Sequence, residues 1–237
     1  ISGTFVYKFG SNGAGNGQLL NPCGLAFGPD GHLFIADFDD YIHRIQVFRA
    51  DGTFVRNFGS CGAENGQFNL PNELAFSTDG RIFVSDSQNS RIQVLRADGT
   101  FVHKFGSYGT GNGQFSEPKG LAFSPDGHLF VSDLANNRIQ VFRADGTFVR
   151  KFGSKGAGDG QFNLPNGLAF SPDGHLFVSD SQNSRIQVFQ ADGTFIHKFG
   201  SKGAGDGQFN LPNGLAFSPD GHLFVSDLIN HRIQVFN

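Results

Sequence analysis

A unit of 47 residues recurs five times along the chain, and this repeat constrains the fold more than any other feature. Residues 144–190 and 191–237 differ at only six positions. The marker Asp-Gly-Thr-Phe recurs at Asp51, Asp98, Asp145 and Asp192, and a degenerate copy begins at Ser2. Repeated units bury their apolar faces against their neighbours. We therefore expect a single domain that spans residues 1–237.

Four stretches of each unit alternate apolar and polar residues with the period of a β-strand. In the fourth unit they are residues 166–171, 175–180, 185–189 and 194–199. Turn residues separate them: Pro-Asp-Gly follows the first stretch, and Ala-Asp-Gly follows the third. This pattern predicts a four-stranded antiparallel sheet for each unit.

The first strand of the unit carries only Gly and Ala on one face, which suits strands crowded around an axis. We therefore predict an all-β fold, a five-bladed β-propeller of four-stranded antiparallel blades. The chain starts with a lone fourth strand, residues 4–9, and ends after a third strand. Because ring closure removes unpaired edges, we predict that residues 4–9 pair with the last blade and complete it.

The unit resembles the NHL repeat, through Leu-Pro-Asn-Gly-Leu-Ala-Phe, Leu-Phe-Val-Ser-Asp, Asn-x-Arg-Ile-Gln-Val-Phe and Gly-Thr-Phe-x-x-x-Phe-Gly. The resemblance covers the whole chain and implies a β-propeller. NHL propellers usually have six blades, whereas this chain supplies material for five. The near-identity of the last two units indicates a recent duplication or deliberate engineering.

An aspartate at the end of the second strand is followed by an arginine in every unit. The pairs are Asp37 and Arg44, Asp86 and Arg91, Asp133 and Arg138, Asp180 and Arg185, and Asp227 and Arg232. The five carboxylates could form a ring for metal binding or acid–base chemistry. We favour a structural ion pair, because a carboxylate beside a guanidinium stays ionised and donates protons poorly.

Histidines follow four of the Asp-Gly turns, at His32, His128, His175 and His222. Equivalent points on separate blades are too far apart for one zinc ion, which needs its nitrogen ligands about 2 Å away. Cys23 and Cys61 occupy non-equivalent positions of the repeat, and we expect them to form no disulfide. We therefore expect no metal, no cofactor and no catalytic residue.

Two residues depart from the repeat at the start of the first strand. Glu73 stands where the other units have Gly, and Lys119 stands where three units have Asn. Both should lie at the mouth of the central channel, in adjacent blades. Together they either orient a polar ligand or compensate each other as an ion pair.

The link between the second and third strands varies most from unit to unit. Because binding residues concentrate on loops held by a rigid scaffold, these links define the best candidate binding surface, which we call the loop face. Apolar residues gather there in the first and last units, and we predict that they meet where the ring closes. The candidates are Phe38, Tyr41, Ile42, Leu228 and Ile229.

We predict a non-enzymatic interaction or scaffold protein that binds a protein, peptide or glycan on this face. The family resemblance adds RNA as an alternative, but a net charge of -3 gives no global attraction for it. A propeller lyase or lactonase is a further alternative, for which converging channel residues are lacking. We expect a monomer without membrane contact, and a cytoplasmic location if the chain is complete, because no signal peptide opens it.

Overall fold

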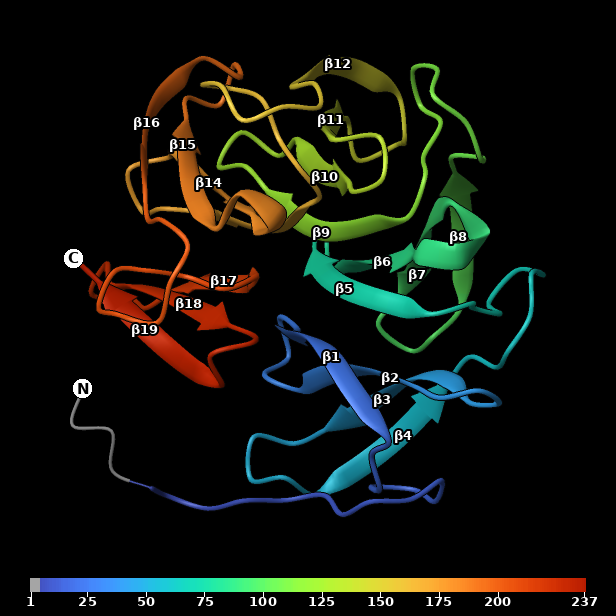
Figure 1. Ribbon diagram of the computed structural model, residues 1–237. Coiled ribbons are helices and arrows are strands. Elements are labelled where there is room, and N and C mark those ends of the chain that lie inside the picture. The colour runs from blue at the N-terminus through green and yellow to red at the C-terminus, as the bar shows by residue number, and fades with distance from the viewer. Residues whose placement is uncertain (1–4) are drawn as a thin grey trace.

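Each repeat forms one antiparallel sheet, and the five sheets stand as blades around a central axis (Figure 1). The computed structural model describes residues 5–237. Blade one consists of β1 (Asn21–Phe27), β2 (Leu33–Phe38), β3 (His43–Phe48) and β4 (Phe54–Phe58). Blade two consists of β5 (Pro71–Phe76), β6 (Arg81–Asp86), β7 (Arg91–Arg96) and β8 (Phe101–Phe105).

The remaining blades repeat the same order of strands. Blade three consists of β9 (Pro118–Phe123), β10 (Leu129–Asp133), β11 (Arg138–Phe142) and β12 (Phe148–Phe152). Blade four consists of β13 (Pro165–Phe170), β14 (Leu176–Asp180), β15 (Arg185–Phe189) and β16 (Phe195–Phe199). Blade five consists of β17 (Pro212–Phe217), β18 (Leu223–Asp227) and β19 (Arg232–Phe236). Two short 3₁₀ turns, Ser87–Asn89 and Ser181–Asn183, connect second to third strands.

The predicted all-β, five-bladed propeller is confirmed, but its predicted closure is not. In blade five the sheet has three strands, β17, β18 and β19. Residues 5–9 form no strand in the described part of the chain, and residue 4 lies outside it. Among residues 5–237, the outer edge of β19 therefore has no partner strand.

The hairpin turns owe their shape to Gly and Asp. In blade three, Gly127 has a φ of +84°, which a residue with a Cβ rarely adopts, and its N–H donates to Ser124 O. In the turn between β11 and β12, Asp145 Oδ1 accepts the N–H of Thr147 at 2.8 Å. Such side-chain bonds hold the turn and fix the register of the strands on either side.

Apolar side chains of blades one to four pack against the following blade. At the boundary between blades three and four, Ile139 and Val141 of β11 join Leu168, Leu176 and Val178 in one buried cluster. The period-2 pattern of the strands creates these faces, because alternate side chains point to the same side of the sheet. Each formed boundary therefore buries one face of each of two blades.

Inner strands approach each other closely where Gly occupies the crowded face. A Cβ on Gly167 would lie 2.2 Å from Asn213 O of the next blade, and one on Gly120 would lie 2.2 Å from Asn166 O. The inner strands pack side by side in the order β1, β5, β9, β13 and β17 (Figure 1). The strands β17 and β1 do not share this close packing. We call this open boundary, between blade five and blade one, the seam.

Candidate functional site

A cavity of about 410 Å³ lies on the axis, and residues from all five blades line it. Most of them belong to the start of an inner strand, so the channel is built from equivalent positions of the repeat. The lining residues are Pro22, Cys23, Gly24, Asn72, Glu73, Lys119, Asn166, Gly167, Asn213, Gly214 and Ser226.

Serine hydroxyls shape the wall of this channel by joining one blade to the next. The register of β13 against β14 shifts between Pro165 and Leu168, which leaves backbone groups of the inner strand unpaired. Ser179 Oγ accepts the N–H of Gly167 at 2.7 Å and donates to Asn213 O of blade five at 2.7 Å. The inner strands are therefore fixed to each other, and the side chains that depart from the repeat stand on a rigid wall.

Glu73 is the only acidic side chain that lines the channel among residues 5–237. It is half-buried, and its Oε1 accepts the N–H of Leu74 at 3.1 Å. Burial raises the pKa of Glu73 to about 7, because the ionised carboxylate loses hydration. The hydrogen bond to Leu74 lowers this pKa in part. A carboxyl group with such a pKa can accept or donate a proton near neutral pH.

Lys119 and Cys23 line the same cavity. Burial lowers the pKa of Lys119, and the nearby Glu117 offsets this effect in part. Among the described residues, no ion pair within 4 Å joins Glu73 to Lys119, so the compensating pair considered above is not formed. The ammonium and the carboxyl group are both available to a ligand in the channel.

Cys23 is a channel residue that the sequence reasoning missed. Its thiol lies 3.3 Å from Pro71 O and 3.3 Å from Asn72 O in blade two. Burial raises the pKa of Cys23 to about 12, so the group is a neutral thiol and a poor nucleophile at neutral pH. The signal was present in the sequence, since Cys23 occupies the position of Asn72, Asn166 and Asn213.

The loop face of blade one presents an exposed aromatic side chain on a hydrogen-bonded backbone. Tyr41 is 83% exposed, and Asp39 Oδ1 accepts the N–H of Tyr41 at 2.7 Å. The ring nitrogens of the buried His43 lie 2.7 Å from Asp39 O and 3.0 Å from Phe68 O. The backbone that carries Tyr41 is therefore held from two sides.

Phe38 and Ile42 are half-buried and belong to the same loop. The Phe38 ring packs edge-on against His43, with the ring centroids 6.4 Å apart. The carbonyl of Ile42 accepts the N–H of Asp39 at 2.8 Å. These two candidates thus pack their own loop, and Tyr41 alone projects from it.

Leu228 and Ile229 of blade five are 52% and 48% exposed. Leu228 lines a shallow pocket of about 150 Å³ together with Leu134, Leu164 and Leu211, which come from blades three, four and five. Leu134 and Leu228 therefore belong to one patch, although they are two blades apart in sequence. No hydrogen bond among the described residues joins this apolar patch to the loop of Tyr41.

The aspartate that recurs at the end of the second strand of each unit is held in a buried hydrogen-bond network. Asp180 accepts the Nε–H of Arg185 at 2.7 Å and the N–H of Asn163 at 2.7 Å, and its side chain is fully buried. The guanidinium also donates to Ala157 O and Gly158 O, both at 2.8 Å, in the Gly-rich crossing. The five Asp–Arg contacts range from 2.6 to 3.1 Å. Each pair ties a crossing to its blade.

Buried glutamines complete these networks and were also missed. Gln187 Nε2 donates to Asp180 Oδ2 at 3.0 Å and to Gln161 O at 2.6 Å, and its Oε1 accepts the N–H of Gly160 at 3.0 Å. The signal was the invariance of Arg-Ile-Gln-Val within the repeat. A polar residue that recurs on a buried strand needs a buried partner.

The four turn histidines each lie beside the aspartate of their own turn, at 2.6 to 3.2 Å. Residues 5–237 contain no cluster of His, Cys, Asp or Glu able to hold a metal ion. Cys23 and Cys61 are free cysteines. Within the same residues, no helix is long and apolar enough to span a membrane.

The fold and the axial cavity define a β-propeller, and the repeat units place it in a family. The model of the NHL repeat matches residues 68–95, 115–142, 162–189 and 209–236. The chain is an NHL-repeat β-propeller. No curated protein matches the chain.

Several solved structures share the fold at low sequence identity. Virginiamycin B lyase from Staphylococcus aureus is 17% identical, with a TM-score of 0.66, covering 91% of this chain and 69% of its own. A gluconolactonase from Xanthomonas campestris is 21% identical, with a TM-score of 0.64, covering 87% of this chain and 69% of its own. A chain of a nidogen/laminin complex is 21% identical, with a TM-score of 0.66, covering 91% of this chain and 75% of its own.

These likenesses overturn the prediction that the protein is not an enzyme. Two of the three structures named above are enzymes, a lyase and a gluconolactonase. A non-enzymatic protein was predicted because the repeated acidic and histidine residues do not converge. That reasoning was insufficient, because a site can be built from a few residues that depart from the repeat, such as Glu73 and Lys119.

Proposed function

We propose that this protein binds a protein partner on its loop face, through the apolar patch around Leu228. The observation that carries the proposal is the shallow pocket of about 150 Å³ in which Leu228 joins Leu134, Leu164 and Leu211. Clustered exposed apolar side chains mark interaction surfaces more often than scattered ones do. Ile229, at 48% exposed, extends the patch.

The neighbouring blade supplies a reference for this patch. Blade four has Ser181 and Gln182 where blade five has Leu228 and Ile229, and the backbone is otherwise equivalent. The N–H of residue 229 donates to Asn210 O at 3.1 Å, as the N–H of residue 182 donates to Asn163 O at 3.1 Å. The fold therefore does not require apolar side chains here, which favours a role in binding.

Tyr41 is a second anchor on the same face of the propeller. Aromatic side chains contribute strongly to interfaces when they are held rigidly, because little conformational entropy is lost on binding. Asp39 and His43 hold the backbone that carries Tyr41, which limits the freedom of this anchor. A partner large enough to cover blades five and one would contact both anchors.

The test is a selection of peptide-library binders against the wild-type protein. Binding of the selected peptides is then measured with two variants. One is the double variant that combines Leu228→Ser and Ile229→Gln, and the other is the single variant Tyr41→Ser. We expect the double variant to weaken binding at least tenfold without loss of stability, because blade four folds with the same residues. The control is Tyr108→Lys, which takes the residue of blade four at another exposed aromatic position. Equal binding by the double variant and wild type would contradict the proposal.

A second candidate function is acid–base chemistry in the channel, favoured by the pKa of about 7 at Glu73. The likeness to a lyase and a gluconolactonase supports assays with a streptogramin B and with a sugar lactone. If Glu73 acts as a general base, turnover should rise with pH through about 7 and disappear in Glu73→Gln. The exposed Glu64→Gln is the control. No turnover by the wild type, or equal turnover by Glu73→Gln, would exclude this function.

A further inference from the structure

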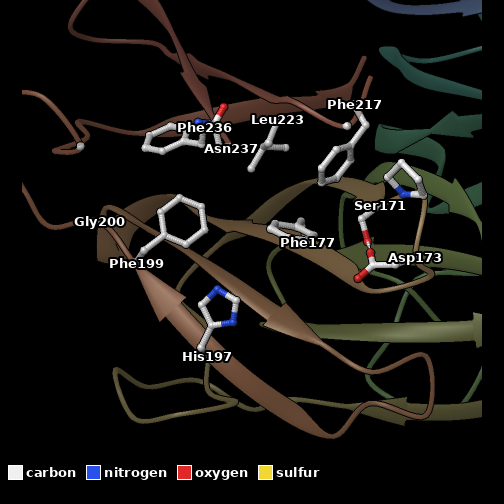
Figure 2. A pocket seen from close by; sticks show the side chains of 13 residues that line it. Ser171, Asp173, Phe177, His197, Phe199, Gly200, Phe217, Leu223, Phe236 and Asn237 are labelled. Atoms are coloured by element: carbon white, nitrogen blue, oxygen red, sulfur yellow. Dashed lines mark hydrogen bonds between the residues drawn. The ribbon is translucent and has the colours of Figure 1, made fainter. Parts of the chain in front are cut away.

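A large apolar cavity between blades four and five is explained by the fold. It measures about 550 Å³, and Figure 2 shows the Phe199 and Phe236 rings on opposite sides of it. The cavity borders β19, the edge strand of the three-stranded sheet of blade five. In blade four the outer strand β16 covers the equivalent face, and its Phe195 packs on Phe189 with the ring centroids 5.9 Å apart. The axial channel is therefore the better candidate for a ligand.

Five equivalent side chains, one from each blade, line the axial channel. Each follows the proline of its inner strand, and together we call them the channel ring. They are Cys23, Asn72, Lys119, Asn166 and Asn213. Asparagine thus recurs in three units, and a lysine replaces it in blade three. The ring is polar at the centre of a fold whose blade boundaries are apolar.

The recurring asparagines have no structural partner for their side chains among residues 5–237. The backbone carbonyls of Asn166 and Asn213 accept the hydroxyls of Ser132 and Ser179, both at 2.7 Å, but their side-chain amides form no hydrogen bond with a described residue. Asn183 also recurs in the repeat, and its side chain donates to a carbonyl of the Gly-rich crossing at 2.8 Å. The blades therefore use Asn183 for their own stability, whereas the channel asparagines are open to a ligand.

Lys119 adds a positive charge to the channel ring. It is half-buried, and its ammonium makes no ion pair within 4 Å with a carboxylate of the described residues. Burial lowers the pKa of Lys119, and the charge of Glu117, which does not line the cavity, offsets this effect in part. The carboxyl group of Glu73, in contrast, already accepts the N–H groups of Leu74 and Leu25. The three N–H donors of the Lys119 ammonium are thus the main unused charged donors of the channel.

The channel ring is continuous with the apolar patch around Leu228. Asn166 and Asn213 line both the axial channel and the shallow pocket that contains Leu228. A ligand that fills this pocket therefore lies beside the channel. One segment of extended peptide can reach both, because successive side chains point to different sides of it.

Backbone hydrogen bonds fix the position of the patch relative to the ring. The N–H of Leu228 donates to Leu211 O at 3.3 Å, two residues before the ring residue of blade five. In blade three the N–H of Leu134 donates to Glu117 O, also at 3.3 Å, two residues before Lys119. The polar and the apolar parts of this surface are therefore built on the same rigid strand ends.

We propose that the partner of the loop face inserts an aspartate or glutamate side chain into the axial channel, where its carboxylate pairs with Lys119, while a nearby apolar side chain of the same segment occupies the pocket of Leu228. This inference rests on the proposed binding of a protein partner on the loop face. A charged hydrogen bond is stronger in a half-buried channel than on the surface, because less water screens it. The amides of Asn166 and Asn213 can donate to the remaining lone pairs of the carboxylate.

Charge decides which class of side chain the channel accepts. A lysine or arginine of the partner would meet the like charge of Lys119. A neutral side chain would cover the Lys119 ammonium without pairing it, and a buried charge without a partner is costly. A carboxylate removes both penalties, so acidic segments are favoured over basic and neutral ones.

Parallel selections test this preference. A random peptide library is selected against the wild type and against Lys119→Asn, which takes the residue of three other units. We expect Asp or Glu close to an apolar residue in the peptides that bind the wild type, and loss of the acidic residue alone in the second selection. The control is Lys151→Asn, which removes the same charge from the exposed side of β12 and takes the residue of Asn57 in blade one. It should select acidic peptides as the wild type does. The same acidic preference with Lys119→Asn would overturn the proposal.

A double-mutant cycle measures the pair itself. A selected acidic peptide and its neutral amide counterpart, with Asn for Asp or Gln for Glu, are titrated against the wild type and against Lys119→Asn. Neutralising the peptide should weaken binding to the wild type about tenfold or more, and binding to Lys119→Asn less than about threefold. Equal losses with the two proteins would show that the carboxylate does not pair with Lys119.

The same peptides separate this inference from the proposed function. Binding that is weakened by the double variant of Leu228→Ser and Ile229→Gln, but not by Lys119→Asn, would overturn the carboxylate site and support docking on the loop face. Binding that depends on Lys119 and not on Leu228 would overturn the proposed function and the two-part site. A library that yields no binder to the wild type would overturn both proposals.

Discussion

The same apolar residues occur at two places in the ring, in different surroundings. One place is the boundary between blades four and five, and the other is the seam between blades five and one. Ile186 and Val188 of β15 are 0% and 2% exposed against blade five. Ile233 and Val235, in the same Arg-Ile-Gln-Val-Phe segment of β19, are 60% and 52% exposed. Identical residues are thus buried in one place and exposed in another, because their burial depends on the next blade and not on their own strand.

Polar contacts show the same contrast. Ser179 Oγ donates to Asn213 O of the next blade at 2.7 Å. The equivalent Ser226 Oγ donates to Gly214 O of its own blade, at 3.4 Å, and to no described group of blade one. A formed boundary therefore adds both apolar burial and a hydrogen bond between inner strands. The seam has neither in the described structure, and the following predictions measure what that difference contributes.

The largest loss of unfolding free energy is expected when a buried ion pair within one blade is broken, because such a pair depends least on the seam. Asp180→Ala should destabilise the protein by about 3–5 kcal/mol, because it leaves a buried guanidinium without its carboxylate. Asp227→Ala should cost less, since the Arg232 side chain is 27% exposed where that of Arg185 is 7% exposed, and water can solvate it. Chemical denaturation measures both. A larger effect of Asp227→Ala would show that blade five is packed more tightly in solution than in this structure.

A comparison of two equivalent isoleucine substitutions distinguishes an open seam from a closed one. Ile186→Ala should cost about 2–4 kcal/mol, because it leaves a cavity in a buried cluster. If the ring closes as the sequence predicts, Ile233→Ala should cost a similar amount. If the seam stays open, the exposed Ile233 side chain should contribute less than about 1 kcal/mol. The ratio of the two unfolding free energies therefore reports the state of the seam.

The smallest effect concerns the channel and depends on pH. Burial raises the pKa of Glu73 from 4.5 to about 7, so the folded protein binds this proton more tightly than the unfolded chain. The associated stability is fully present below pH 4.5 and is lost as pH rises to about 7. Relative to Glu73→Gln, the wild type should lose about 1–3 kcal/mol across this window. A difference that does not change with pH would show that Glu73 is well hydrated.

The regular part of the fold was predictable because it depends on short-range patterns. The expected strand at residues 185–189 is β15, Arg185–Phe189, and the expected strand at 175–180 is β14, Leu176–Asp180. The crowding of the first strand followed from Gly120 and Gly167, whose absent Cβ atoms make room for the next blade. Each of these features is decided within one unit or between two adjacent units.

The remaining features depend on relations that one unit does not contain. The angle between blades is set by packing, so the repeat does not state whether five units close a ring. Glu73 and Lys119 are in adjacent blades, but the sequence does not give the separation of their side chains, and they form no ion pair. The joining of Leu228 with Leu134 across blade four also depends on the curvature of the ring.

Hydrogen exchange at β19 tests the closure of the ring most directly. The amides of Arg232–Phe236 that do not pair with β18 have no partner strand in the described part of the chain, whereas the corresponding amides of Arg185–Phe189 pair with β16. If Phe5–Phe9 adds to β19, these amides should be protected to a degree similar to those of β15, and deletion of residues 1–9 should remove the protection. Exchange of the β19 amides at the rate of an unpaired edge in the full chain would contradict the account.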